Sequence, residues 1–462
     1  MSAATDFPTR WHNTGQTEYG FHKEGLALKE RNTASASWTY RLGVAALYLF
    51  ALSTWLSKAG GNLALALMLL AFFLDFRAAA SMVRRNPVFI LSAVFAIYLL
   101  ARVAWAAWEF PATVADQVSG AQEWIFLWLF PFVAWWIGTN KNHITWIFFL
   151  AVAGLFVGIV LRLDWSQLGA IIEGARSGFG RPIPVMALFS ATALVGLFMA
   201  APRVWGAMTN RLWFVLRGIL WIVLVGALLE IVIVSQSRIT WLAVLLVLPP
   251  LLWVRLRGGG YRPQFFSGRL TLLLGILSVL AIGSVLYANM ATLSARFAQE
   301  KETIEKIVTF ELENVPYDSV GTRAHLNNFG FGMWLERPLF GWGPGTRVTQ
   351  FADTPVSDWT HLHNTYLEVL VKFGLFGAVL FVAGLWAVGR SLWNAYRAAW
   401  LPQDYFLIVV GAFALLAIWS LANFRMTNDW RFHCILFGAV AYAFSLTRSM
   451  SQASPSACKE KP

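Results

Sequence analysis

Long blocks of apolar residues, separated by short polar stretches, dominate the pattern along the chain. The clearest blocks are 61–74, 219–234 and 271–287, which carry few or no charged side chains. A backbone in the hydrocarbon core of a bilayer must satisfy its own hydrogen bonds, so a block approaching about 20 apolar residues predicts a helix that crosses a membrane. The pattern therefore predicts an all-α polytopic membrane protein.

The same pattern recurs over most of the chain. We predict about twelve transmembrane helices, at 38–57, 61–76, 87–107, 121–138, 143–162, 183–202, 212–234, 239–255, 269–288, 363–389, 403–421 and 430–447. The domain organisation expected from this is a tail at 1–37, helices 1–9 within 38–288, a large loop at 289–362, helices 10–12 within 363–447 and a tail at 448–462. Because long connections without secondary structure are uncommon, we expect the large loop to have a function.

Charge gives the chain an orientation. The sequence is 58% hydrophobic and 13% charged, with a formal net charge of +12. Lys and Arg gather in both tails and in alternate connections, whereas the other connections are poorer in them and include Glu109, Asp116 and Glu123. The positive-inside rule then places both termini in the cytoplasm and the large loop on the opposite side. Topology accounts for the positive charge, and no basic module with interleaved aromatic residues points to nucleic acid.

The large loop has two parts with different patterns. Residues 292–312 combine charged and apolar positions at helical spacing, which predicts an amphipathic helix lying on or over the membrane. The later run from Glu336 to Gly345 is rich in Gly and Pro, which predicts a tight turn system instead of a helix.

His363 is the strongest candidate for chemistry among seven histidines. It stands at the expected start of the tenth membrane helix, with Asp358 and Thr360 as candidate N-cap residues. The positive end of the helix dipole favours a neutral imidazole in the first turn, and a neutral imidazole is a usable general base. The alternative is a histidine that anchors the helix at the membrane interface.

Three arginines on the outer side form the second candidate feature. Arg181 and Arg238 lie at expected membrane boundaries, and Arg323 lies in the large loop. Such arginines commonly extend to the interface, but several that converge would suit a diphosphate, which guanidinium groups bind in bidentate fashion.

Several absent motifs narrow the possible functions. The sequence has no Asp-X-Asp and no Cys/His cluster with metal spacing, so a bound diphosphate would be neutralised by arginines instead of a metal ion. It has no Walker A motif, which argues against ATP-driven transport. The charges within expected spans are few, chiefly Arg102, Glu230 and Lys372, whereas an ion-coupled transporter usually has more.

Four short motifs in the large loop and the following helix together resemble the O-antigen ligase/polymerase superfamily, which includes protein O-oligosaccharyltransferases. The resemblance is dense over about 320–380 and rests on Gly321-Thr322-Arg323, on Glu336-Arg337-Pro338-Leu339-Phe340-Gly341-Trp342-Gly343-Pro344-Gly345, on His363-Asn364-Thr365-Tyr366-Leu367-Glu368, and on Gly374-Leu375-Phe376-Gly377. Arg238, in its Ser-Gln-Ser-Arg setting, supports it.

The resemblance implies a GT-C-like glycosyltransferase of the bacterial inner membrane, with its active site on the periplasmic side. Such enzymes move a glycan from undecaprenyl diphosphate to an acceptor. By the same resemblance His363 would be the general base, Arg238 and Arg323 would hold the donor diphosphate, Arg181 would be a third member, and His361 could assist.

Within this family we expect a ligase that attaches O-antigen to lipid A–core, without a metal or other cofactor and with inversion at the anomeric carbon. A polymerase typically has a second substantial outer loop, but the stretch at 163–182 is only moderate in length. Protein O-oligosaccharyltransferases often carry extra sequence after the last helix. A transporter of lipid-linked glycans that performs no chemistry is the alternative from another class.

Overall fold

The computed structural model is helical throughout the part of the chain that it describes. That part is 38–453, with gaps at 77–79, 81–82, 85, 139, 206–210, 258–275, 278–279, 281–282, 285, 299–300, 310–313, 351–358, 425 and 429. The N-terminal tail, the end of the C-terminal tail and most of the predicted segment 269–288 lie outside the described residues. The prediction of an all-α fold is confirmed for the described residues.

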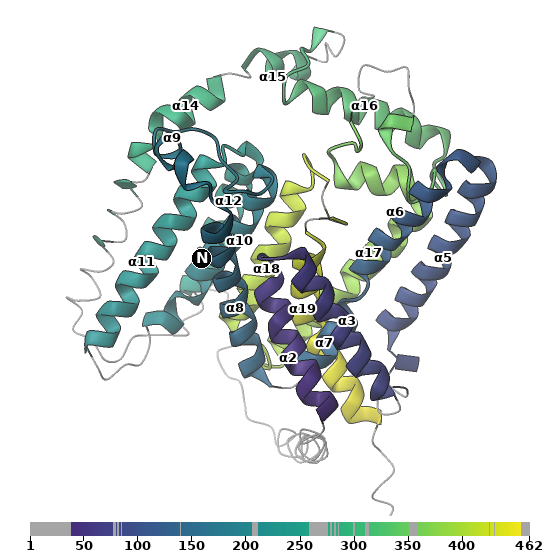
Figure 1. Cartoon of the computed structure of the whole chain (residues 1–462), viewed down its shortest axis with the longest axis horizontal. Helices are drawn as coiled ribbons and strands as arrows, with labels where there is room; N and C mark the ends of the chain where they lie inside the picture. The colour runs from purple at the N-terminus through teal and green to yellow at the C-terminus, as the bar shows by residue number, and fades with distance from the viewer. Residues whose placement is uncertain are drawn as a thin grey trace, which may run out of the picture.

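Most long helices run side by side, and three helices of the large loop lie across one end of them (Figure 1). These three are α14 (Met290–Ala298), α15 (Lys301–Val308) and α16 (Gly321–Glu336). We call this end of the molecule the loop end. Their position over the helix ends is what brings loop residues close to the ends of the membrane helices.

The helices beneath form three neighbouring groups. The first contains α2 (Trp38–Ser53), α3 (Lys58–Leu74), α7 (Phe130–Ile137), α8 (Lys141–Arg162) and α19 (Arg431–Ala453). The second contains α10 (Ile183–Trp205), α11 (Arg211–Val234), α12 (Arg238–Arg257) and α18 (Gln403–Trp419). The third contains α5 (Pro87–Glu109), α6 (Val114–Leu127) and α17 (Thr365–Arg397), with a short α9 (Leu168–Ile172) at the loop end beside the second.

Six helices of the described residues are long and apolar enough to cross a membrane, and they lie within α5, α8, α10, α11, α12 and α17. Shorter apolar helices occur at α3, α18 and α19. The total of twelve spans stays a prediction. Local sequence explains several helix starts, since Ser57 and Asn86 cap α3 and α5 with their side-chain oxygens and Pro87 occupies the first position of α5.

The structure divides one predicted span and contains one helix that was not predicted. The segment 121–138 falls in two helices, α6 and α7, because Pro131 lacks the N–H that a continuous helix would use. Within the described residues, the predicted amphipathic segment at 292–312 is helical over α14 and α15. The helix α16 was not predicted at all.

Gly374 breaks α17 into two halves, 365–373 and 375–397. Its φ of 60° and ψ of −167° lie outside the helical region, and a Cβ added there would lie 2.3 Å from the carbonyl carbon of Leu339. Glycine is therefore required at this position. The break deprives the adjoining turns of helical hydrogen bonds, and at membrane depth such groups need partners within the protein.

The main chain of 338–343, within the Gly- and Pro-rich motif, supplies those partners. The bonds, of 2.8 to 3.1 Å, run from the N–H groups of Trp342, Gly343, Leu375 and Phe376 to the carbonyls of Val371, Lys372, Pro338 and Leu339, respectively. We call residues 338–343 the plug segment. It joins both halves of α17 by backbone hydrogen bonds and so stabilises the break.

Two polar side chains of α5 complete the same region. The Arg102 guanidinium, in a side chain that is 6% exposed, donates to the Gly341 carbonyl at 2.7 Å. The Tyr98 hydroxyl donates to the Phe373 carbonyl at 2.7 Å. A charged group at membrane depth is expensive unless it has such a partner. The buried Arg102 side chain therefore has a structural role, which is to stabilise the break in α17 through the plug segment.

The plug segment is also fixed to the neighbouring α5–α6 connection. Arg337, just before it, forms a bidentate ion pair with Glu109, and its guanidinium lies 4.1 Å from the Trp342 ring centroid. This ion pair raises the pKa of Arg337 further. Just after the segment, the Gly345 N–H donates to the Gln117 side chain at 2.9 Å. The segment is therefore held on both sides.

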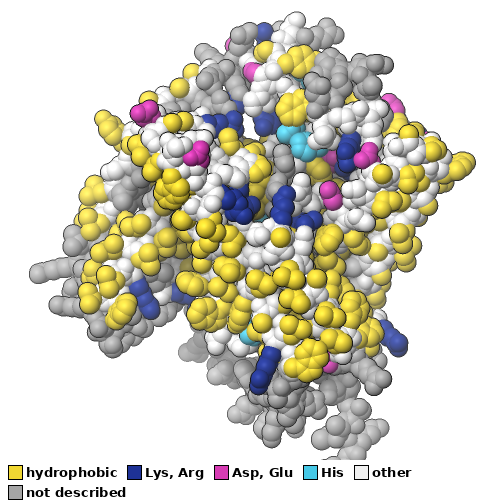
Figure 2. Space-filling model, in the orientation of Figure 1, with side chains coloured by type: hydrophobic (Ala, Val, Ile, Leu, Met, Phe, Trp, Pro, Cys, Tyr) yellow, Lys and Arg dark blue, Asp and Glu magenta, His cyan; other side chains and the backbone are white. Residues whose placement is uncertain are grey.

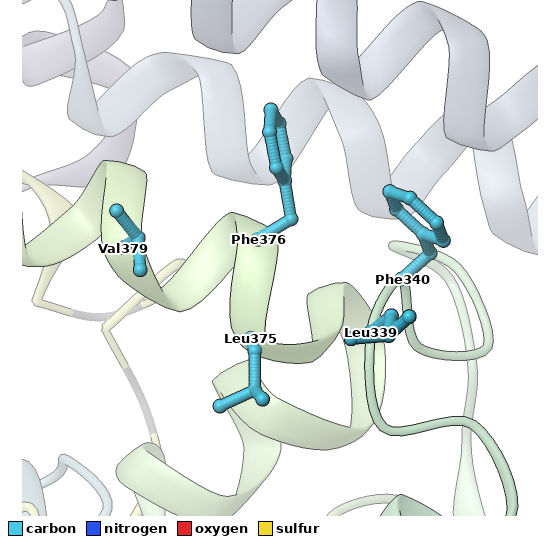
Figure 3. Close-up of a pocket in the computed structure, with 5 residues that line it drawn as sticks. All are labelled: Leu339, Phe340, Leu375, Phe376 and Val379. Carbon is cyan, nitrogen blue, oxygen red and sulfur yellow. The ribbon is translucent and has the colours of Figure 1, made fainter.

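A small separate core lies between α16 and the first half of α17. Its buried members are Leu326, Met333, Val348, Leu362, Leu367 and Val371. We call these six residues the cap core. On the other side of the break, an open apolar hollow of about 280 Å³ is lined by Leu339, Phe340, Leu375, Phe376 and Val379, and Figure 3 shows Phe340 and Phe376 extending to the same side of it.

Candidate functional site

His363 lies immediately before α17, not in its first turn as predicted. The N-cap is Asn364, whose side-chain oxygen accepts hydrogen bonds from the N–H groups of Tyr366 and Leu367. Thr360 is therefore not the cap, and Asp358 lies outside the described residues. Asn364 takes this role because its short amide side chain reaches the first free N–H groups of the helix.

The backbone of His363 has a φ of 55°, which is uncommon for a residue other than glycine. Its half-buried ring lies 4.9 Å from the ring of Trp359 and 4.2 Å from that of His361, at steep angles to both. His361 in turn lies 5.9 Å from the Phe424 ring. The imidazole therefore lies between one indole ring and one other imidazole ring at the loop end.

Arg323 lies in the first turn of α16. Its Nε donates to the Ala422 carbonyl at 3.1 Å, and its Nη1 donates to the carbonyl and hydroxyl oxygens of Ser319 at 2.7 and 3.0 Å. The Asp318 carboxylate accepts from the N–H groups of Val320 and Gly321, which fixes the start of this helix. Arg323 is therefore a half-buried cation at a helix N-terminus, where the Asp318 carboxylate offsets part of the positive charge.

The connection between α18 and α19 also contacts the start of α17. The Thr365 N–H donates to the Ser420 carbonyl at 2.9 Å, and its hydroxyl donates to the Asn423 carbonyl at 2.7 Å. We call residues 420–424 the collar segment. Arg323 and the start of α17, next to His363, are thus held by carbonyls of neighbouring residues in one short segment.

Arg238 joins this region from a third direction. It is the first residue of α12, and two residues further on the Thr240 hydroxyl accepts a hydrogen bond of 3.0 Å from the Trp419 indole, directly before the collar segment. Burial opposes ionisation of Asp318, but hydrogen bonds from Gly321, Thr303 and Val320 and the positive charge of Arg238 outweigh it and lower the pKa of that carboxyl. Arg238 therefore acts electrostatically on the start of α16.

Arg181 lies beside this cluster on a different turn. Its guanidinium donates to the carbonyls of Trp55 and Leu56 at 2.8 and 2.7 Å, between α2 and α3. The Leu56 carbonyl also accepts a hydrogen bond from Arg162. The structure thus brings Arg323 and the residues next to Arg238 and His363 to the collar segment, while the described hydrogen bonds of Arg181 go to the turn between α2 and α3.

The loop before Arg181 links it to the turn that precedes Arg238. Arg176 Nε donates to the Ser235 carbonyl at 3.1 Å, and the Gln236 side chain donates to the Gly174 carbonyl at 3.0 Å. Arg176 was not predicted from the sequence, although its place five residues before Arg181 in the same loop was a signal.

Positive side chains gather in the middle of one face, between a broad apolar belt and the loop end, and histidine side chains lie close to them (Figure 2). In the described residues no group of three or more His, Cys, Asp or Glu side chains could hold a metal ion. Converging guanidinium groups suit an anion with several oxygens, and a nearby imidazole suits proton transfer. The expectation of a metal-independent reaction stays a prediction.

Apolar helices that can cross a membrane and a polar site at one end of them define a multi-pass helical membrane protein. Residues 223–382 match the family model described as O-antigen ligase. This match covers 160 of the 462 residues and supports a relation of the chain to the O-antigen ligase superfamily, whose members are glycosyltransferase-like ligases and polymerases. No curated protein matches the sequence significantly. The matched residues include Arg238, Arg323, the plug segment and His363, but neither Arg181 nor the collar segment.

Proposed function

We propose that this protein is an O-antigen ligase. It transfers O-antigen polysaccharide from undecaprenyl diphosphate to lipid A–core, in a metal-independent reaction that inverts the anomeric carbon. It lies in the bacterial inner membrane with about twelve GT-C-like spans, both termini in the cytoplasm and the loop end in the periplasm. Membrane lipids surround it and deliver the donor.

One observation carries the proposal. Arg238, Arg323 and His363 come from three separate parts of the sequence. Arg323 contacts the collar segment itself, Thr365, two residues after His363, contacts it too, and Thr240, two residues after Arg238, contacts Trp419 directly before it. The family match covers all three residues. Cations beside an imidazole are what a reaction with a diphosphate leaving group and a hydroxyl nucleophile requires.

The proposed reaction uses one proton transfer. His363 accepts the proton of an acceptor hydroxyl, and the oxygen attacks the anomeric carbon from the face opposite the diphosphate. The new carbon–oxygen bond forms as the bond to the diphosphate oxygen breaks, and undecaprenyl diphosphate leaves with that electron pair. Arg238 and Arg323 stabilise the negative charge that develops on it, with Arg181 as a third member.

The test is transfer by purified protein supplied with undecaprenyl-diphosphate glycan and lipid A–core. We expect His363→Ala to reduce the rate by about 10²–10⁴-fold, the usual contribution of a general base. His325→Ala is the matched control, because His325 also lies at the loop end, where Nε2 contacts the Val315 carbonyl. Near-wild-type transfer by His363→Ala would contradict the assignment of the base.

The products of the same assay separate the alternatives. A glycan ladder on lipid A–core supports a ligase, whereas longer glycans that stay on undecaprenyl diphosphate support a polymerase. Movement of the donor between leaflets without a new covalent product supports a transporter. Loss of transfer in excess EDTA, with recovery on addition of Mg²⁺ or Mn²⁺, would refute the metal-independent mechanism.

A further inference from the structure

A buried ion pair lies within the first half of α17. Glu368 and Lys372 are 2% and 8% exposed, and Lys372 Nζ lies 2.9 Å from one carboxylate oxygen of Glu368. Both charges lose most of their hydration, and the attraction between them offsets only part of that cost. A buried pair is therefore weak evidence for stability, and its other contacts deserve a functional explanation.

The second carboxylate oxygen of Glu368 points back toward the segment before the helix. It accepts a hydrogen bond of 3.0 Å from the backbone N–H of Leu362, six residues earlier. The Leu362 side chain is 2% exposed and belongs to the cap core. The residue before His363 is therefore fixed through both its backbone and its side chain.

His363 thus lies between two anchored residues. Leu362 precedes it, and Asn364, the N-cap of α17, follows it. The φ of 55° at His363 allows the chain to turn between these anchors, and an unfavourable backbone conformation persists only where its surroundings hold it. The hydrogen bond from Leu362 to Glu368 is one of those restraints.

Lys372, the cation of the pair, extends to the collar segment. Lys372 Nζ lies 5.2 Å from the centroid of the Phe424 ring, in the collar segment whose Ala422 carbonyl holds Arg323. The ion pair therefore connects the backbone next to His363 with the collar segment, which holds Arg323, the residue proposed to bind the diphosphate.

We infer that Glu368 is a positioning residue for His363, acting through the backbone of Leu362, and that Lys372 compensates its buried charge. This inference rests on the proposed function, because it assumes that His363 takes part in transfer. Small displacements of a reacting group can reduce a rate by about 10²-fold. The expected signature is a lower kcat with little change in KM for the lipid-linked donor.

Two variants separate positioning from charge. Glu368→Asp keeps the negative charge beside Lys372 but shortens the side chain, so it no longer reaches Leu362. The double variant Glu368→Gln with Lys372→Met keeps an oxygen within reach of that N–H and removes both charges. We expect kcat to fall by about 10- to 100-fold in Glu368→Asp, and by less than about fivefold in the double variant. KM for the donor should change by less than about threefold in both.

Asp404→Glu is the matched control, since Asp404 is a 4% exposed carboxylate paired with Arg203 in another helix. Two results would overturn the inference, provided that His363→Ala is inactive. One is a full kcat in Glu368→Asp, and the other is a kcat in the double variant as low as that of Glu368→Asp. A His363→Ala variant with full activity would instead overturn the proposed function. If Glu368→Asp does not fold, the kcat of the double variant decides between positioning and charge.

Discussion

The plug segment and the collar segment both bind backbone groups of α17, but at opposite ends of its first half. The plug segment closes the break at Gly374 with its own main chain, and its tight approach requires glycine at that position. The collar segment holds the start of the helix through the backbone carbonyls of Ser420 and Asn423. Any residue type could supply these carbonyls. The first arrangement produces a recognisable motif, whereas the second does not.

The difference shows that a conspicuous sequence motif need not lie at the functional site, and that a segment at the site need not carry a motif. The Gly- and Pro-rich run carried much of the family resemblance, yet its described contacts are explained by the fold. The collar segment lies outside the matched residues 223–382 but contacts Arg323 and the start of α17 next to His363. We therefore expect changes around the plug segment to affect stability first, and changes around the collar segment to affect transfer first.

The largest expected effect is that of Gly374→Ala. A Cβ at this position meets the Leu339 carbonyl carbon at 2.3 Å, and alanine does not adopt these dihedral angles, so we expect a loss of about 3 kcal/mol or more. Thermal unfolding of the purified protein in detergent measures it. Gly389→Ala, in the same helix, is the control, because a Cβ there meets nothing within 4 Å. Equal melting temperatures of the two variants would show that the plug segment adapts.

A smaller effect is expected from Arg102→Met. It removes the hydrogen bond to the Gly341 carbonyl and leaves that acceptor buried, which we expect to cost about 2 kcal/mol. Transfer should decline in proportion to the folded fraction. Arg102→Lys, which retains the charge, should recover part of the loss. If Arg102→Met abolished transfer at an unchanged melting temperature, Arg102 would belong to the site and the contrast between the two segments would fail.

The smallest effect on stability is expected from Thr365→Val. This variant loses the hydrogen bond to the Asn423 carbonyl, with an expected cost of about 1 kcal/mol, but it loosens the start of α17 beside His363, so we expect transfer to fall by about tenfold. Thr192→Val is the control, since Thr192 is a buried threonine bonded within its own helix. Transfer rates that fall equally in both variants would contradict a special role of the collar segment.

Sequence patterns located helices well because apolar blocks reflect local composition. The break at Gly374 was not predicted, because an isolated glycine in a helical pattern does not reveal whether another segment inserts there. The helix α16 was missed because glycines at 330 and 332 weaken its pattern. Gly330 instead permits close packing, since a Cβ there would lie 2.6 Å from the side chain of Leu362.

The candidate residues were found by their chemistry and by the family motifs, but their arrangement was not. Nothing in the sequence shows that Arg323 contacts the Ala422 carbonyl, because backbone acceptors are present at every residue. Arg181 was grouped with Arg238 and Arg323 because all three lie on the predicted outer side of the membrane. Its contacts with Trp55 and Leu56 depend on a helix turn far away in the sequence.

The cap core has a practical consequence for engineering. Its six residues bury α16 against the first half of α17, and Gly374 separates that half from the rest of the helix. Chimaeras of related enzymes are therefore best joined at the break, with α16, the plug segment and the first half of α17 exchanged as one block. Recombination inside the block would combine cap-core residues from two parents that do not pack together. Recombination at Gly374 keeps all six cap-core residues from one parent.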